Sequence, residues 1–155
     1  YEVSNYARSG ARSRHNVGYW VGRDYLGLGC GAWGTLSSGG QRVRYRNTPS
    51  PERYLASRAS FAHASLSEVG PLVANYEPIP PQTALAERIM LGLRLADGVD
   101  LERAAEELGT PLWTPDRARA RDRLLGQGKL RLEDGRALIP KQHWLFADGI
   151  IANLM

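Results

Sequence analysis

The sequence contains a single cysteine and no long hydrophobic run, and each shortage excludes a class of structure. Because Cys30 is alone, the chain cannot form an internal disulfide or a zinc site built from several thiolates, and it suits a reducing cytoplasm. No apolar run approaches the roughly 20 residues that span a bilayer, so we expect no transmembrane segment. No base lies near Cys30 in the sequence, which favours a small buried thiol over a nucleophile.

The chain also lacks a large excess of charge of either sign. The chain has 20 Lys and Arg against 16 Asp and Glu, a net charge of +4, and nearly all the cations are arginine. Such a balance attracts acidic partners only weakly, and the mixed signs predict a solvated exterior. The first residues are neither a signal peptide nor an initiator methionine, so we expect the chain to start at a cut point.

The sequence changes character near residues 78–81. Most glycines and tyrosines come before this point, and residues 1–6, 25–28 and 41–46 read as short strands. After it the pattern is helical. We therefore divide the chain into residues 1–77 and 78–155.

Three helices are predicted in the second part. The first covers residues 83–98, with a Thr83 cap, a stop at Gly98 and one apolar face. The second follows Asp100 and ends at Gly109, and the third opens at Thr114-Pro115 and runs toward residue 126. The apolar face of the first helix consists of Leu85, Ile89, Leu93 and Ala96.

The chain closes with a predicted β-hairpin and an apolar helix. Residues 129–139 alternate around Asp134-Gly135, a strong hairpin signal, and residues 144–154 form the helix. Three helices followed by a hairpin is the order of a winged-helix module, so nucleic-acid binding is one hypothesis. The arginines of the third helix alternate over two faces, however, so no single basic stripe forms and we expect no nucleic-acid partner.

A glycine-rich run at residues 27–34 formally contains G-x-G-x-x-G. A dinucleotide site needs a helix to begin there, whereas residues 35–40 read as a loop, so the match is spurious. The glycines still allow a close backbone approach, either to a ligand or to a neighbouring strand.

The run His15-Asn16-Val17-Gly18-Tyr19-Trp20 carries the most chemistry. Imidazole and tyrosinate can ligate haem iron, and an indole can stack on a porphyrin. The alternative is a polar loop with Tyr19 and Trp20 anchored in the core. If Gly18 breaks the segment, His15 and Tyr19 need not share a face.

Five motifs, in this order along the chain, resemble the radical SAM proteins related to oxygen-independent coproporphyrinogen III oxidase, and most closely their HemW-type haem chaperone branch. The motifs are EVSNYAxxG at residues 2–10, SRHNxxYW at 13–20, DYLGLGxGA at 24–32, RN at 46–47 and ERIMLGLRLxxGV at 87–99. The last resembles the start of that family's C-terminal domain.

The resemblance implies an α/β fold: the end of a partial β/α radical SAM barrel over residues 1–77, then a mainly α, winged-helix-like C-terminal domain with a β-hairpin. The family's barrel binds a [4Fe-4S] cluster through CxxxCxxC and S-adenosylmethionine on its open iron. Cys30 cannot supply three thiolates, so the chain alone should be inactive. We therefore expect a missing N-terminal radical SAM half as its partner.

The family also implies which residues meet cofactors. Its chaperone branch binds haem through HNxxYW, which the true oxidase lacks, so His15 becomes the expected iron ligand, Tyr19 a substitute and Trp20 a stacking wall. Asn16 completes this motif. A related loop lies by S-adenosylmethionine in the oxidase, which transfers to Gly29, Gly31, Ala32 and Trp33.

These assignments predict a haem chaperone that delivers haem to apo-haemoproteins in the cytoplasm. The alternative within the family is a coproporphyrinogen III oxidase of porphyrin biosynthesis.

Overall fold

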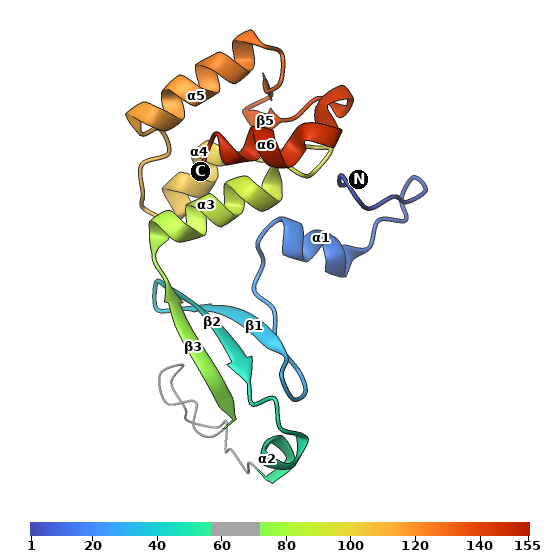
Figure 1. Cartoon of the computed structure of the whole chain (residues 1–155), viewed down its shortest axis with the longest axis vertical. Coiled ribbons are helices and arrows are strands. Elements are labelled where there is room, and N and C mark those ends of the chain that lie inside the picture. The colour runs from blue at the N-terminus through green and yellow to red at the C-terminus, as the bar shows by residue number, and fades with distance from the viewer. Residues whose placement is uncertain (57–71) are drawn as a thin grey trace. The chain divides into compact units, whose positions relative to one another are not determined.

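The computed structural model describes residues 1–56 and 72–155, which form two compact units (Figure 1). The helical unit consists of Tyr1–Arg23 and Pro81–Met155, and the sheet unit is Asp24–Pro80. The chain is thus a mixture of helices and small antiparallel sheets, which confirms the α/β class. The winged-helix and partial-barrel assignments, and the domain division at residue 77, stay predictions.

The helical unit is built around one apolar core. Its elements are α1 (Arg14–Trp20), α3 (Pro81–Gly92), α4 (Leu101–Glu107), α5 (Pro115–Gly126), β4 (Arg131–Glu133), β5 (Arg136–Leu138), the 3-10 helix η1 (Lys141–Phe146) and α6 (Ala147–Ala152). Leu85, Ile89 and Leu93 are almost completely buried at its centre. None of the described helices is long and apolar enough to cross a membrane.

Local signals placed two of these helices, α4 and α5, and the β4–β5 hairpin correctly. The Asp100 carboxylate accepts from Arg103 N–H at 2.9 Å, and the Thr114 hydroxyl accepts from Arg117 N–H at 3.2 Å, which caps α4 and α5. Asp134 and Gly135 both have positive φ, 49° and 76°, as a two-residue hairpin turn requires.

The first helix differs from its prediction at both ends. It begins at Pro81, two residues before Thr83, and ends at Gly92 rather than near Gly98. A Cβ at Gly92 would lie 2.6 Å from Val99 Cβ, so the returning chain packs directly against the end of α3. The predicted closing helix likewise splits into η1 and α6.

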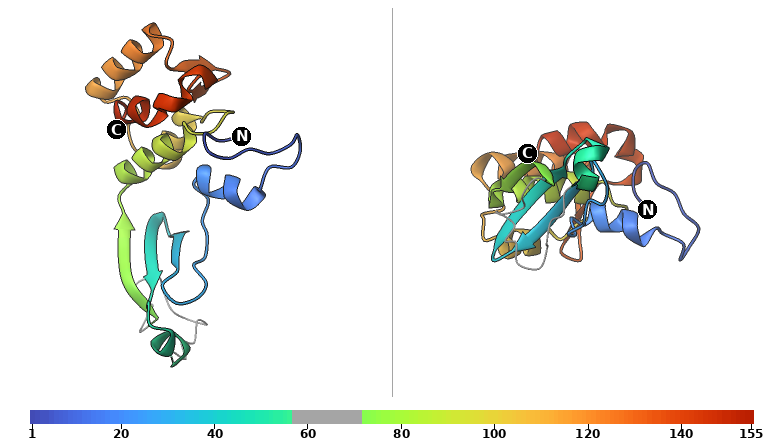
Figure 2. Two further views of the ribbon diagram at one scale, coloured as in Figure 1. Left: turned by 45° about the vertical axis from the view of Figure 1, so that its right-hand side comes forward. Right: turned by 90° about the horizontal axis from the view of Figure 1, so that it is seen from below.

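The sheet unit is a three-stranded antiparallel sheet in the order β1-β2-β3 (Figure 2). Its elements are β1 (Trp33–Ser38), β2 (Gln41–Asn47), α2 (Pro51–Ala56) and β3 (Val73–Ile79). The strand expected at 41–46 is therefore confirmed, and the loop expected at 35–40 is mostly wrong, because residues 33–38 pair with β2 and only Gly39-Gly40 turns.

The two other expected strands are wrong. Residues 25–28 contribute only an isolated bridge between Tyr25 and Thr35. Residues 1–6 turn back on themselves, since Glu2 bridges both Asn5 and Leu95. His63, to which the sequence assigned no role, lies outside the described residues.

Candidate functional site

The histidine-containing motif folds as α1, not as a loop. Ser13 caps the helix, because its hydroxyl accepts from Asn16 N–H at 3.2 Å. Val17 N–H then donates to the Ser13 carbonyl at 2.9 Å and starts the helical ladder. Gly18 lies inside the helix and does not break it.

Helical spacing divides the motif into two pairs. His15 and Tyr19 are four residues apart and share a face, with ring centroids 4.9 Å apart in an edge-to-face arrangement. The His15 side chain is exposed and makes no hydrogen bond or ion pair with the described residues. Its imidazole is therefore available to a ligand.

Asn16 and Trp20 form the second pair and anchor the helix. Asn16 Nδ2 donates to the Tyr1 hydroxyl at 2.9 Å. The Arg94 guanidinium carbon lies 5.2 Å from the centroid of the Trp20 ring, within cation–π range. One side of Trp20 is thus occupied by Arg94, whereas the sequence assigned the ring to stacking on porphyrin.

Arg94 is the centre of this anchoring network. Its guanidinium donates to Glu2 Oε1 at 2.9 Å, to Asp148 Oδ1 at 2.8 Å and to Ser4 Oγ at 3.1 Å. Glu2 is completely buried, and burial alone would raise its pKa. Hydrogen bonds from Asn5, Ser4 N–H and Arg94 outweigh burial and lower the pKa, so the carboxylate stays charged.

The sequence pointed to neither Glu2 nor Arg94 as a functional residue. They lie 92 residues apart, and no local pattern couples them. Both do fall within motifs that carry the family resemblance, at residues 2–10 and 87–99. That shared membership was the one available signal.

A groove of about 420 Å³ lies beside the end of α1. Four arginines line it together with Trp20, and the indole N–H of Trp20 is buried without an acceptor among the described residues. The arginines are Arg23, Arg88, Arg103 and Arg136.

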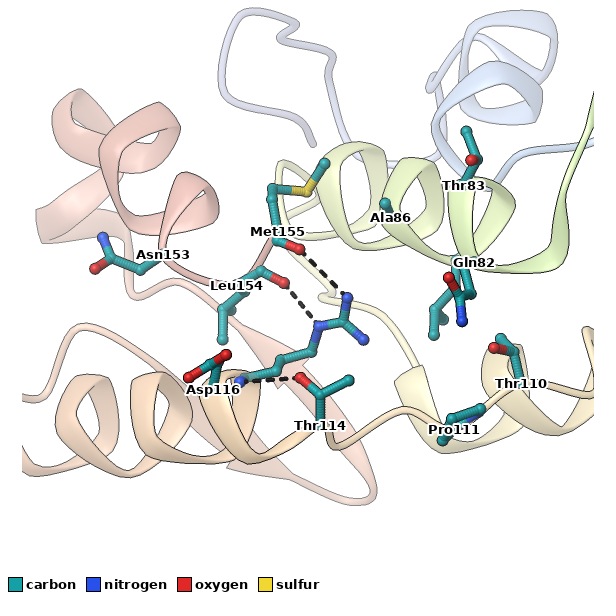
Figure 3. A pocket seen from close by; sticks show the side chains of 12 residues that line it. Gln82, Thr83, Ala86, Thr110, Pro111, Thr114, Asp116, Asn153, Leu154 and Met155 are labelled. Atoms are coloured by element: carbon teal, nitrogen blue, oxygen red, sulfur yellow. Dashed lines mark hydrogen bonds between the residues drawn. The ribbon is translucent and has the colours of Figure 1, made fainter.

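A second cavity, of about 590 Å³, lies between the start of α3, the start of α5 and residues 153–155 (Figure 3). Arg117 reaches across it and donates to the Leu154 carbonyl at 2.8 Å and to the Leu112 carbonyl at 2.7 Å. This cavity contains none of the residues predicted to bind a cofactor.

The remaining predicted residues, Gly29, Gly31, Ala32 and Trp33, belong to the sheet unit. Their loop is held by its own chain: Asn47 Nδ2 donates to the carbonyls of Gly27 and Gly29, both at 2.9 Å, and Gly31 N–H donates to the Thr48 carbonyl at 2.9 Å.

Close packing within the sheet unit accounts for one further glycine of this run. A Cβ at Gly27 would lie 2.6 Å from the Trp33 carbonyl carbon, so the backbone approaches its neighbour too closely for a side chain. Cys30 is exposed, which corrects the expectation of a buried thiol.

The arginines of α5 are engaged within the chain. Arg119 pairs with Asp116, Arg121 pairs with Asp122, and Arg123 donates to Asn153 Oδ1 at 2.7 Å. The two ion pairs neutralise two of the four arginines of the helix, which disfavours a nucleic-acid interface on α5. Over residues 1–56 and 72–155, no group of three or more His, Cys, Asp or Glu side chains could hold a metal ion.

Comparison with known proteins identifies the family. Residues 79–146 match the model of the HemN C-terminal domain. The heme chaperone HemW of Mycobacterium tuberculosis is 31% identical over the whole chain, and that of Bacillus subtilis is 32% identical over 72% of it. The chain is HemW/HemN-like and matches the C-terminal portion of these radical SAM proteins.

The HemW/HemN-like chain spans 34% of the length of the Mycobacterium relative and 26% of the Bacillus one. Its fold is also similar to that of coproporphyrinogen III oxidase (HemN) from Escherichia coli, a radical SAM enzyme, with a TM-score of 0.53 and 13% sequence identity. That similarity covers 85% of this chain and 28% of the oxidase, and it concerns the fold alone.

Proposed function

We propose that this chain binds haem as cargo through His15, as part of a haem chaperone that transfers haem to apo-haemoproteins. The observation that carries the proposal is an exposed imidazole, without a hydrogen-bond partner in the described chain, on a capped helix. A neutral imidazole nitrogen is a common ligand of haem iron. Relatives named heme chaperone HemW support the same assignment.

The paired arrangement of α1 suits this role. The edge-to-face contact with Tyr19 restricts the His15 ring, and Asn16 and Trp20 hold the helix from its other side. A ligand that is restricted before binding loses less entropy when it coordinates the iron. Tyr19 offers a second ligand, its phenol oxygen, one helical turn away from the His15 nitrogen.

The experiment is a titration of the chain with ferric haem, followed by the Soret absorption band. We expect a saturable Soret shift that His15→Ala weakens at least tenfold. His143→Ala is the matched control, because His143 lies on η1, away from α1 in the sequence. Equal haem affinity of the wild type and His15→Ala would refute the role of His15.

A coproporphyrinogen III oxidase is the second candidate, supported by the match to the HemN C-terminal domain. The HNxxYW residues favour the chaperone over it. Conversion of coproporphyrinogen by a longer, cluster-loaded protein under anaerobic reducing conditions would establish the oxidase, and absence of product with an intact cluster would exclude it.

The family's other features are proposals for the longer protein. There, Gly29, Gly31, Ala32 and Trp33 would lie by S-adenosylmethionine, and a preceding radical SAM half would supply the [4Fe-4S] cluster and its three cysteines. The exposed side of Trp33, with the Arg46 guanidinium 5.7 Å from its ring centroid, is the surface of this loop that such a ligand could meet. The cytoplasmic location of the protein also stays a prediction.

A further inference from the structure

We infer that the arginine-lined groove beside α1 binds the propionate carboxylates of the porphyrin whose iron His15 ligates. This inference rests on the proposed haem function and adds a separate anion site to it. Haem is an apolar plate with two carboxylates at one edge, so a complete site needs cations at a suitable distance from the iron ligand.

The position of the groove matches that requirement. Trp20 lines the groove and lies five residues after His15, about 7.5 Å along the axis of α1. That separation is comparable with the distance from the centre of a porphyrin to its propionates. Trp20 itself is rotated by about 140° from His15 around the helix, so a porphyrin on His15 would reach the groove past Gly18, where Arg23 lies, and not past Trp20.

One arginine of the groove reaches the flank of α1 next to His15. Gly18 lies next to His15 on the helix surface, because it follows His15 by three residues. A Cβ at Gly18 would lie 3.8 Å from Arg23 Cδ, so the Arg23 side chain runs back beside the helix. A second arginine of the groove, Arg88, packs over Gly22, two residues after the end of α1, since a Cβ at Gly22 would lie 2.7 Å from Arg88 Nε.

The groove has more positive than negative charge. Its two acids already have partners, since Asp100 caps α4 and Glu107 pairs at 2.9 Å with Arg103, one of the four arginines of the groove. Arg136 donates to the carbonyls of Asp97 and Gly98, which fixes its fork in place. Arg23 is exposed and has no ion pair or hydrogen bond from its side chain within the described residues, so it is the cation most available to a ligand.

The buried indole of Trp20 is an independent observation. Its N–H has no acceptor among the described residues, although a buried donor normally has one. A carboxylate is the kind of acceptor that this donor lacks, and guanidinium groups bind carboxylates in two-pronged geometry.

The test compares haem with haem dimethyl ester, in which both carboxylates are blocked. We expect Arg23→Gln to weaken haem binding about fivefold and to leave ester binding unchanged. Arg23→Lys should recover part of the affinity, because it restores the charge without the fork. Arg131→Gln is the matched control: it removes the same charge from the exposed hairpin strand β4, outside the groove.

The outcomes separate this inference from the proposed function. If the wild type binds haem through His15 but Arg23→Gln changes haem and ester affinity equally, or changes neither, the groove is not a carboxylate site. If the wild type binds neither haem nor its ester, the proposed function fails and the inference fails with it. A selective loss of haem affinity in Arg23→Gln, absent in Arg131→Gln, establishes the site.

Discussion

Replacing Arg94 with alanine tests the network that holds α1 in place. The substitution removes the cation that binds Glu2, Ser4 and Asp148 and that covers the Trp20 ring. We expect it to destabilise the helical unit strongly, because it leaves the buried Glu2 carboxylate without its charged partner.

The magnitude follows from the burial of the two partners. The Glu2 side chain is 0% exposed and that of Arg94 is 20% exposed. Breaking a buried ion pair by removing one partner costs about 3–5 kcal/mol. Water can enter at the partly exposed guanidinium position, so we expect the lower end, about 3 kcal/mol, including the lost contact with Trp20.

Asp148→Asn is the control, because it removes a different ion pair of the same arginine. The Asp148 side chain is 88% exposed, so its pairing with Arg94 is screened by solvent. We expect a loss of less than about 0.5 kcal/mol.

The effect should also depend on pH. Because the folded-state pKa of Glu2 is lowered from 4.5, its stabilising contribution is complete above that value and is lost as the pH falls through the folded-state pKa. In Arg94→Ala, burial raises the pKa of Glu2 with less opposition, so the carboxyl binds a proton earlier. The free-energy difference between wild type and variant should therefore be largest near pH 7 and shrink toward pH 3.

Urea unfolding followed by the circular dichroism of the helices measures these free energies at both pH values. A loss below about 1 kcal/mol at pH 7 for Arg94→Ala would refute the reasoning. So would a loss of the same size at pH 7 and pH 3, because it would show that the Glu2 charge is not involved.

Two further predictions concern single side chains, both measured by thermal or urea unfolding. Gly98 and Gly128 have similar positive φ, 64° and 66°, but a Cβ at Gly98 would lie 2.8 Å from Leu138 Cβ, whereas nothing lies within 4 Å at Gly128. Gly128→Ala should cost about 1–2 kcal/mol from backbone strain alone and Gly98→Ala clearly more, so equal losses would contradict the packing argument. Trp20→Phe removes a buried N–H without an acceptor, which offsets part of the cost of the smaller ring and of the weaker Arg94 contact, so the net loss should stay below about 2 kcal/mol; a larger loss would indicate that this N–H has a partner.

Features whose partners lie within a few residues were predictable from the sequence. Asp100 and Thr114 cap amides three residues ahead of them, and the Asp134-Gly135 turn depends only on local backbone preference. The residues of the HNxxYW motif belong to the same class, since that pattern and its part of the family resemblance lie within consecutive positions.

Features that depend on distant partners were not predictable. Residues 35–40 read as a loop because two serines and two glycines follow one another there, and pairing with β2 makes residues 35–38 part of a strand. The first helix stops at Gly92 because Val99 packs there, although the apolar spacing continues beyond it. The alternative of a polar loop at residues 15–20 is also wrong, although there the capping residue, Ser13, is local.

By itself, the sequence determined the identities of the candidate ligands, the helix caps, the hairpin and the family. Tertiary structure alone decided that His15 and Tyr19 form one exposed face while Asn16 and Trp20 anchor the other. The physical reason is that the anchors of α1, Tyr1 and Arg94, are brought to it by folding. A buried carboxylate at Glu2 then fixes Arg94, and no window of neighbouring residues contains that pair.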